Sequence, residues 1–245
     1  AAFGDVAPAG TIEAMAVKAC LNGGRTRDEH PAVPLTAAEL AADAGEVRAA
    51  GAFAVHVHPR DSGGVQTLSA RACDAAVVAI RAAVPGVPVG LSTAEQIDPD
   101  PFARAAAIRT WRQRPDFVSV NFSELGWAGI VRGALHAGIG VEAGLSTPAD
   151  AEQLARSPFA HQLTRALVEV DGGAEDARAV ARLIPAGIPQ VWHGFGPRTW
   201  EVIAAGAAAG VDVRIGLEDV LVLPDGRVAA GNAELVAAAV ELVGN

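Results

Sequence analysis

Residues 52–61 read AFAVHVHPRD, and this stretch alternates valine with histidine at its centre. Side chains two positions apart lie on one face of a β-strand, so His56 and His58 point one way while Val55 and Val57 point the other. A face of valines is typical of a strand that packs against helices. The pattern therefore predicts a strand at 52–58 with two imidazoles on its inner face.

Similar short strands return about eight times along the chain, and a helical pattern follows each one. We expect strands at 16–22, 52–58, 87–93, 116–123, 139–145, 163–171, 189–195 and 211–218. The helical patterns cover 36–50, 69–84, 99–113, 126–138, 148–157, 174–185, 197–209 and 232–243. Strict alternation indicates parallel strands, because each crossover needs a helix. Eight units without a linker favour a closed (β/α)8 TIM barrel over an open doubly wound sheet, with 1–245 as a single domain and 1–13 as an N-terminal arm.

Local signals mark several helix boundaries. Thr36 with Glu39 makes a capping box, Ser69 is placed to cap the second helix, and Thr147 precedes a proline at a first helical position. Helices are expected to end at Gly51, Gly86, Gly138 and Gly210.

The composition is that of a globular protein, with 51% apolar and 19% charged residues in 245, close to the ~250 residues of a typical barrel. A formal net charge of −9 argues against a nucleic-acid partner, which needs a basic face. No apolar run approaches the ~20 residues of a membrane span, and the stretch 1–10 lacks the pattern of a signal peptide. We expect Cys20 and Cys73 to be reduced core thiols in a cytoplasmic protein.

Strand alternation separates polar from apolar side chains on the other strands too. Because apolar residues must meet the helices, the polar set faces the barrel interior, near the carboxyl ends of the strands where barrel active sites are built. Besides the two histidines, this inner set comprises Gly90, Ser92, Ser119, Asn121, Glu142, Gly144, Arg214, Gly216 and Glu218.

Two imidazoles on one strand face, together with an inward carboxylate, make a metal-ligand set. Catalytic zinc commonly uses three protein ligands and keeps a position for water or substrate, and iron(II) accepts a similar triad. The alternative is a pair of hydrogen-bonded core histidines. Burying both imidazoles beside charged groups without a ligand would carry a large desolvation cost, which favours the metal.

The sequence Gly194-Phe195-Gly196 precedes a helix and is similar to a small phosphate-binding turn. Backbone N–H groups of Gly194 and Gly196 would then hold the phosphates of a cofactor. A plain tight turn is the alternative. His136 and His161 fall in or near helices and are expected at the surface, whereas His193 is expected near the pocket.

Six stretches in this order resemble the β-keto acid cleavage enzyme family, from about residue 16 to the C-terminus. They are LNGGRTR at 21–27 leading to HP at 30–31 and PLT at 34–36, HVHPRD at 56–61, LST at 91–93, Asn121, GFG at 194–196 and RIGLED at 214–219. The resemblance implies a zinc-dependent barrel that condenses a β-keto acid with acetyl-CoA to give acetoacetate and a new acyl-CoA. We also expect a homo-oligomer, either a dimer or a tetramer.

The resemblance assigns roles to individual residues. His56, His58 and Glu218 match the metal ligands, which implies one Zn²⁺ per chain. Arg214 and Asp219 match residues that the family uses in the chemistry. An arginine beside the metal can pair with a carboxylate or a developing oxyanion, and Asp219 is the carboxylate expected to move the proton.

Further residues are expected around the substrate. Ser92 and Glu142, on neighbouring inner faces, would hydrogen-bond around the reacting carbonyls, although Glu142 alternatively pairs with an interior arginine. Ser119 and Asn121 match polar residues that line the family's substrate site, and Ser119 stands where some relatives have threonine. Asn22 is expected in the same site.

The sequence departs from the family pattern after the first strand. Members that act on amino-bearing keto acids carry a glutamate there, where this chain has Gly24. The neighbouring Arg25 predicts a neutral or anionic substrate tail instead. Arg60 either contacts an anionic substrate or pairs with Asp61 at the rim. The chain is also shorter than typical members around its fifth and sixth units.

Other functions fit parts of the same pattern. A metal-dependent aldolase-type lyase would cleave a keto acid without CoA, and a non-catalytic barrel would only bind a metal-chelated metabolite. Amidohydrolase barrels place His-x-His on the first strand, whereas here the pair ends the second. Product formation that depends on CoA would distinguish a β-keto acid cleavage enzyme from these alternatives.

Overall fold

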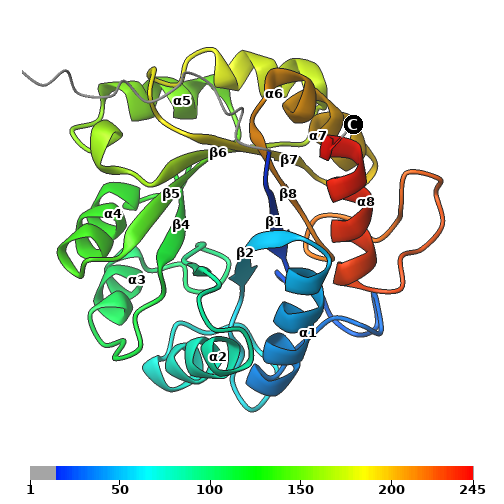
Figure 1. Ribbon diagram of the computed structural model, residues 1–245. Coiled ribbons are helices and arrows are strands. Elements are labelled where there is room, and N and C mark those ends of the chain that lie inside the picture. Colours follow the sequence, from blue (N-terminus) through cyan, green and yellow to red (C-terminus); the bar gives the residue numbers. More distant parts are fainter. Residues whose placement is uncertain (1–14, 245) are drawn as a thin grey trace, which may run out of the picture.

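The computed structural model describes residues 15–244 and shows one closed barrel of eight parallel strands in sequential order, surrounded by helices (Figure 1). The strands are β1 (Val17–Cys20), β2 (Ala52–Val57), β3 (Val89–Ser92), β4 (Phe117–Asn121), β5 (Gly140–Leu145), β6 (Arg165–Val170), β7 (Gln190–Gly194) and β8 (Asp212–Ile215). The barrel prediction is confirmed. The predicted N-terminal arm at 1–13 lies outside the described residues.

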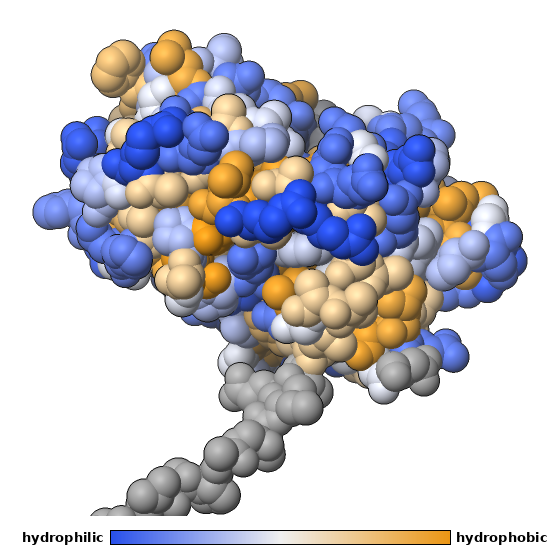
Figure 2. All heavy atoms as spheres, turned by 90° about the horizontal axis from the view of Figure 1, so that it is seen from above, coloured by the Kyte–Doolittle hydropathy of each residue, from blue (hydrophilic) through white to orange (hydrophobic). Residues whose placement is uncertain are grey.

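The outer layer consists of helices that follow the strands one by one. They are α1 (Ala37–Ala49), α2 (Ala70–Ala83), α3 (Pro101–Ile108), α4 (Trp127–His136), α5 (Pro148–Arg156), α6 (Ala174–Ala181), α7 (Thr199–Ala209) and α8 (Asn232–Gly244), with short 3-10 turns at Ala160–Gln162 and Gly196–Arg198. Within residues 15–244, none of the helices combines the length and apolar character needed to cross a membrane. The face seen in Figure 2 is mostly hydrophilic, with apolar groups between the polar side chains.

Most predicted helix boundaries follow their local signals. The capping boxes at Thr36 and Thr147 are both formed, the second with Asp150. The Ser69 prediction is wrong, because its side chain makes no capping hydrogen bond to α2. The four predicted terminal glycines all have positive φ, which a residue without a Cβ adopts without strain.

Cross-strand register places the inner residues side by side. Cys20 and Gly90 lie opposite His56 on the strands that flank β2, and Lys18 lies opposite Arg214 where β1 closes the barrel against β8. Gly90 leaves room for the ring of Phe117, since a Cβ on Gly90 would lie 1.9 Å from that ring. The outward valines and leucines of the strands form one core with the helices.

The eighth strand ends earlier than predicted, at Ile215 rather than residue 218. A Cβ on Gly216 would lie 1.9 Å from the carbonyl oxygen of Cys20, so glycine allows the chain to pass close to β1 and turn. Glu218 therefore lies on a turn after β8 and not on the strand. Strand alternation had nevertheless predicted an inward side chain. Glu218 does line the cavity, because the turn directs it back over the barrel.

Asn232, the first residue of α8, is buried and holds this turn in place. Its Oδ1 accepts a hydrogen bond from the Leu217 amide at 2.7 Å. Its Nδ2 donates to the Leu21 carbonyl at 2.8 Å and to Asp43 at 2.6 Å. One side chain thus joins the end of β1, the turn after β8 and helix α1.

Asn232→Ala should destabilise the protein, because it leaves the buried Leu217 amide and Leu21 carbonyl without partners. We expect a loss of about 1–3 kcal/mol in the free energy of unfolding, measured by urea denaturation. Gln162→Ala removes an exposed amide and should change that free energy by less than about 0.5 kcal/mol. Equal effects of the two substitutions would show that Asn232 does not hold the turn.

Candidate metal centre and pocket

A cavity of about 470 Å³ opens at the carboxyl ends of the strands, a size suited to a small molecule. Its wall is mainly polar. The lining residues are Gly24, His56, His58, Ser92, Ala94, Glu95, Gln96, Ser119, Asn121, Ser123, Glu124, Ser146, Glu169, Phe195, Arg214 and Glu218.

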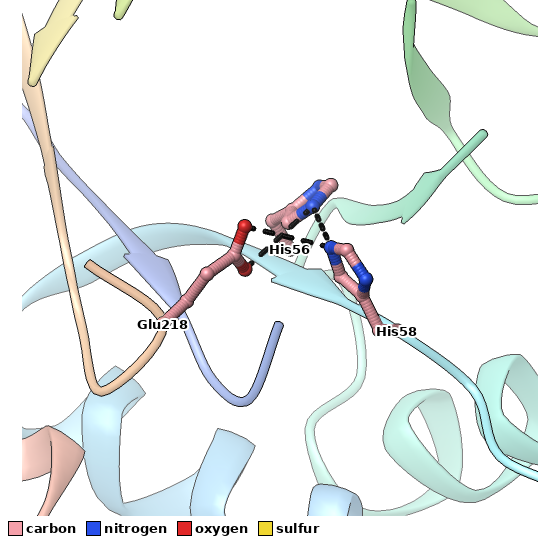
Figure 3. A group of neighbouring side chains, drawn as sticks. All are labelled: His56, His58 and Glu218. Carbon is pink, nitrogen blue, oxygen red and sulfur yellow. Dashed lines mark hydrogen bonds and ion pairs between the residues drawn. The ribbon is translucent and has the colours of Figure 1, made fainter. Parts of the chain in front are cut away.

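Three side chains converge on one point of this cavity: His56 and His58 from β2 and Glu218 from the turn after β8 (Figure 3). The two Nε2 atoms are 3.2 Å apart. The Glu218 carboxylate oxygens lie 3.8 Å from Nε2 of His56 and 3.5 Å from Nε2 of His58. One ligand atom from each residue lies within 4.8 Å of the others, as a three-ligand metal site requires.

Neighbouring groups orient both imidazole rings. Nδ1 of His58 donates to the Gln66 side-chain oxygen at 2.5 Å, which places the ring proton on Nδ1 and leaves Nε2 with its lone pair. Nδ1 of His56 lies 3.4 Å from the Ser119 hydroxyl. Such contacts on the far ring nitrogen are how proteins fix histidine ligands.

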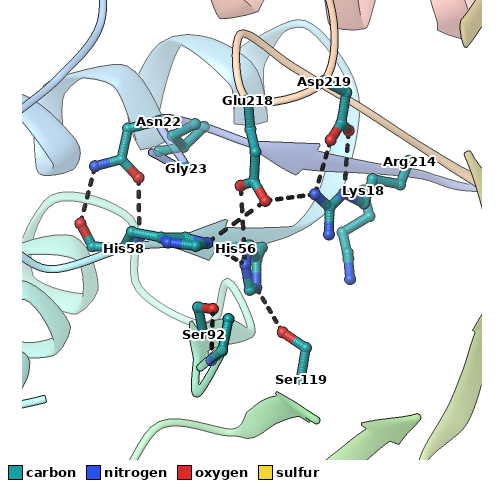
Figure 4. Close-up of polar contacts among 12 residues, drawn as sticks. Lys18, Asn22, Gly23, His56, His58, Ser92, Ser119, Arg214, Glu218 and Asp219 are labelled. Carbon is teal, nitrogen blue, oxygen red and sulfur yellow. Dashed lines mark hydrogen bonds and ion pairs between the residues drawn. The ribbon is translucent and has the colours of Figure 1, made fainter. Parts of the chain in front are cut away.

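The carboxylate is held by the chain around it. Arg214 donates to Glu218 Oε1 at 2.6 Å (Figure 4). A Cβ on Gly23, whose φ is +50°, would lie 2.4 Å from Cγ of Glu218, so glycine at this position admits the acidic side chain. The other carboxylate oxygen, Oε2, is buried and has no hydrogen-bond partner among the described residues.

The ionisation states suit a cation. Burial lowers the pKa of His56 well below its usual value, so this imidazole is neutral. Burial alone would raise the pKa of Glu218, but Arg214 and the two imidazoles outweigh it and hold that pKa well below its usual range. Two imidazole nitrogens and one carboxylate with an unpartnered oxygen fit a divalent metal such as zinc. Hydrogen bonding between the histidines alone would leave Glu218 Oε2 unsatisfied.

Cys20 lies opposite His56 in the register of β1 and β2, yet it is not expected to bind the metal. Burial raises the pKa of its thiol well above the usual value, and a metal ligand must be a thiolate. Cys20 and Cys73 are both buried free thiols, as predicted.

Arg214 organises the centre of the site. Its Nε and Nη2 donate to the two oxygens of Asp219, at 3.0 and 2.8 Å, in a bidentate pair. Arg214 lines the cavity, whereas Asp219 is fully buried behind it. Burial raises the pKa of Asp219, although the arginine charge opposes that shift.

Some residues predicted for the substrate site do line the cavity, and others lie outside it. Ser92, Ser119 and Asn121 line it as expected. Glu142 does not, because it forms a buried ion pair with Lys18 below the cavity and faces Arg165 at 3.4 Å. The prediction that Glu142 acts on the substrate is therefore not supported, and its alternative role as a partner of interior cations is.

Two arginines predicted for the substrate site, Arg25 after β1 and Arg60 after β2, have structural contacts instead. Arg25 forms an ion pair with Glu29, with 2.7 Å between Nη1 and Oε1, and it does not line the cavity. Arg60 donates to the carbonyl oxygens of Gly23, Arg25 and Gly64, and it does not pair with Asp61. Neither arginine lines the cavity, because loop carbonyls hold the Nη atoms of Arg60 and the Glu29 carboxylate holds Arg25.

Asn22 also supports the site from behind. Its Oδ1 accepts from the His58 amide and its Nδ2 donates to the His58 carbonyl, both at 2.9 Å. Asn22 therefore fixes the backbone of His58, and it is not among the residues that line the cavity.

The glycine turn after β7 has its N–H groups occupied. The Gly196 amide donates to the Asp219 carbonyl at 2.8 Å, and the Arg198 amide bonds to the Phe195 carbonyl at 3.3 Å. A Cβ on Gly194 would lie 2.9 Å from Val202, so this glycine serves the packing of α7. The Gly196 amide is therefore engaged within the protein, which favours the plain-turn alternative over a phosphate-binding turn.

Two buried residues lie on β6 and β7. Glu169 was not predicted, and His193 was predicted only to lie near the pocket. Glu169 on β6 lines the cavity, and its position two residues from Leu167 on the inner face would have revealed it by the same alternation. His193 on β7 is fully buried, 3.5 Å from Glu169 and 3.6 Å from Asp219, and neither ring nitrogen has a hydrogen-bond partner among the described residues. His136 and His161 are exposed, as predicted.

The structure thus defines a (β/α)8 barrel with a candidate three-ligand metal centre at the carboxyl ends of its strands. A sequence profile of the β-keto acid cleavage enzyme family matches residues 15–188 and 175–245. The chain belongs to this family. It is similar to the 3-keto-5-aminohexanoate cleavage enzyme of Fusobacterium nucleatum subsp. nucleatum, at 26% identity over 94% of this chain and 92% of that protein.

Solved structures agree on the fold. The apo structure of ObcA superimposes with a TM-score of 0.71 at 17% identity, covering 86% of this chain and 61% of ObcA. The 3-hexulose-6-phosphate synthase of Salmonella typhimurium gives a TM-score of 0.58 at 15% identity, covering 94% of this chain and 98% of that protein. At these identities the likeness concerns the barrel alone.

The metal site predicts about one divalent ion per chain after dialysis, mostly zinc, measured by inductively coupled plasma mass spectrometry. The double variant His56→Ala/His58→Ala should lose it, because a single carboxylate does not retain the ion. The matched control His136→Ala/His161→Ala removes two exposed imidazoles and should keep the metal. Full occupancy in the first variant would contradict the assignment.

Proposed function

We propose that this protein is a zinc-dependent enzyme that cleaves a β-keto acid with acetyl-CoA, giving acetoacetate and a new acyl-CoA. The observation that carries the proposal is the metal-ligand triad of His56, His58 and Glu218 with Arg214 beside it, in a chain of the β-keto acid cleavage family. A β-keto acid offers a carboxylate and a ketone oxygen that together can occupy the open positions of such a site. When bound, zinc supplies Lewis-acid polarisation of the ketone and a template for the acid.

The chain's own residues would orient the acid and stabilise charge. Ser92 and Ser119 line the cavity on β3 and β4 and present hydroxyls beside the metal ligands. Arg214 carries a fixed positive charge at the cavity wall, where it can pair with the substrate carboxylate or with the oxygen that becomes negative as the carbon–carbon bond breaks.

Asp219 supports Arg214 through two hydrogen bonds and is fully buried. A carboxylate in this position holds the guanidinium in one orientation and balances its charge inside the barrel. It can also exchange a proton with the reacting enolate if Arg214 shifts. In the proposed reaction, the Arg214–Asp219 pair would therefore both stabilise negative charge and move a proton.

Products separate this function from a lyase that needs no CoA and from a binding protein. The purified zinc-loaded enzyme would be incubated with a mixture of β-keto acids, with and without acetyl-CoA, and analysed by mass spectrometry. We expect acetoacetate and a new acyl-CoA only when both substrates are present. Loss of keto acid without acetyl-CoA would identify the lyase, and binding without any turnover would identify the binding protein.

Asp219→Asn should retain the metal and lower kcat by on the order of 10²–10⁴-fold, because the amide cannot balance Arg214 or take a proton. The rate would be measured with the keto acid found in the product assay. Asp225→Asn, an exposed aspartate in the loop between β8 and α8, serves as the matched control and should leave the rate unchanged. Normal turnover by the Asp219 variant would remove this residue from the chemistry.

A further inference from the structure

A groove on the outer side of the barrel, between helices α4 and α5, combines aromatic rings with arginine side chains. The two helices are neighbours in the ring of helices around the strands (Figure 1). This outer groove encloses about 410 Å³. Trp127 and Arg132 of α4 line one side of it, and Arg156 of α5 and Phe159 line the other. The proposed reaction has so far given none of these four side chains a part.

A smaller cavity lies between the outer groove and the metal centre. This middle cavity encloses about 320 Å³ and is formed mainly by the loop from β4 to α4. Ser123 and Glu124 line both the middle cavity and the cavity at the metal ligands. Trp127 and Gln153 line both the middle cavity and the outer groove. The three hollows therefore follow one another from the metal ligands across the rim of the barrel to its outer side.

The arginines of the outer groove are available to an anion. Among residues 15–244, Arg132 has no carboxylate within ion-pair distance, and its guanidinium lies over the ring of Phe159, 5.9 Å from the ring centroid. Arg156 pairs with Glu152 at 3.2 Å, but the Arg156 side chain is 71% exposed, and an ion pair in such a position contributes little. Both guanidinium groups can therefore turn to a ligand. In a chain with a formal net charge of −9, they provide the local positive charge that an anionic ligand needs.

The aromatic rings of the outer groove are held from within. Trp127 stacks on Phe122 with 4.2 Å between the ring centroids, and it meets the ring of Phe159 edge to face at 6.4 Å. Trp127 and Phe159 are only partly buried, so part of each ring is left for a ligand. Nucleic-acid bases stack on aromatic side chains, and phosphates pair with guanidinium groups. The outer groove thus combines the two side-chain types that recognise an adenine nucleotide.

The middle cavity suits an uncharged chain. Glu124 is the one ionisable residue among those that line it, and the buried Arg104 already pairs with this carboxylate. Nε2 of Gln153 donates to the Phe122 carbonyl at 2.6 Å, which leaves Oε1 of Gln153 to accept from an amide. Leu125, which is 78% exposed, adds apolar surface. Apolar surface with an amide acceptor matches a chain of methylene and amide groups.

We infer that the outer groove binds the adenine nucleotide of acetyl-CoA, with Arg132 and Arg156 at its phosphates. The middle cavity then receives the pantetheine arm, and the thioester reaches the metal centre. The inference rests on the proposed function for the identity of this co-substrate. CoA carries its thioester, its neutral diamide arm and its phosphorylated adenosine in the same order as the three hollows. The outer groove replaces the phosphate contacts predicted at Gly194 and Gly196, because the Gly196 amide is engaged within the protein.

Binding measured without a keto acid tests the inference, because no reaction then takes place. Isothermal titration calorimetry on the full-length zinc-loaded protein would compare acetyl-CoA with S-acetylpantetheine, which keeps the thioester and the arm but lacks the nucleotide. We expect the wild type to bind acetyl-CoA roughly 10- to 100-fold more tightly, the range of charge-assisted hydrogen bonds to phosphate. Arg132→Gln/Arg156→Gln should remove most of this preference and leave the affinity for S-acetylpantetheine unchanged.

A matched double variant separates contact with the nucleotide from the general attraction of an anion. Arg178 and Arg182 are exposed at the end of α6 and line none of the three hollows. Arg178→Gln/Arg182→Gln removes the same charge, and we expect it to keep the preference for acetyl-CoA. Zinc content, melting temperature and the elution volume in size-exclusion chromatography would show that both variants are folded, loaded and unchanged in assembly.

Four results would overturn the inference. The first is that the wild type binds the two compounds equally or binds neither, and the second is that the preference persists in folded Arg132→Gln/Arg156→Gln. The third is an equal loss of preference in the α6 variant, which would indicate general electrostatic attraction. The fourth is a loss that accompanies a change of assembly, which would assign the outer groove to a contact between subunits.

The outcome is independent of the proposed reaction. A protein that prefers acetyl-CoA through these arginines but forms no acyl-CoA would retain the nucleotide site and contradict the proposed function. A protein that converts acetyl-CoA and S-acetylpantetheine with equal kcat/KM would retain the function and contradict the nucleotide site.

Discussion

The site depends on the bidentate pair between Arg214 and Asp219, because the barrel interior offers little water to solvate charge. An unpaired ion in such surroundings is strongly destabilising, whereas a paired and hydrogen-bonded one is tolerated. With Asp219 behind it, Arg214 also donates from Nη2 to Glu218 and holds that carboxylate beside the two histidines. Lys18 and Glu142 satisfy each other lower in the same interior. These two ion pairs balance charge inside the barrel, beside and below the candidate metal site.

Backbone geometry brings these charges together. Gly216 lets the chain approach β1 and turn, Asn232 ties the turn to β1 and α1, and Gly23 leaves space for the Glu218 side chain. None of these three residues contacts the metal position, yet each limits where the third ligand can lie. The histidines need less support because both come from the end of one strand. The carboxylate is accordingly the ligand whose place depends most on the rest of the fold.

The sequence was sufficient for the barrel and for the two candidate histidine ligands, because both follow from alternation along strands, whereas Glu218 was matched to a ligand by the family resemblance. Each strand is short and buried, so the alternation of side chains between its two faces fixes which of them point inward. Contacts between side chains from different parts of the fold could not be predicted in this way. Strand alternation placed Glu142 inside the barrel but did not show that it forms an ion pair with Lys18. It also could not show that Arg25 pairs with Glu29. Glu169 satisfied the same rule and was overlooked, since no motif drew attention to β6.

Metal coordination in solution gives the most direct test of this account. Zinc K-edge X-ray absorption on the loaded protein should show two imidazole nitrogens at about 2.0–2.1 Å, with the remaining ligands oxygen. Binding of a β-keto acid should change the oxygen shell and leave both imidazoles in place. A sulfur ligand, which the neighbouring Cys20 would have to provide, or scattering from fewer than two imidazoles would contradict the proposed centre.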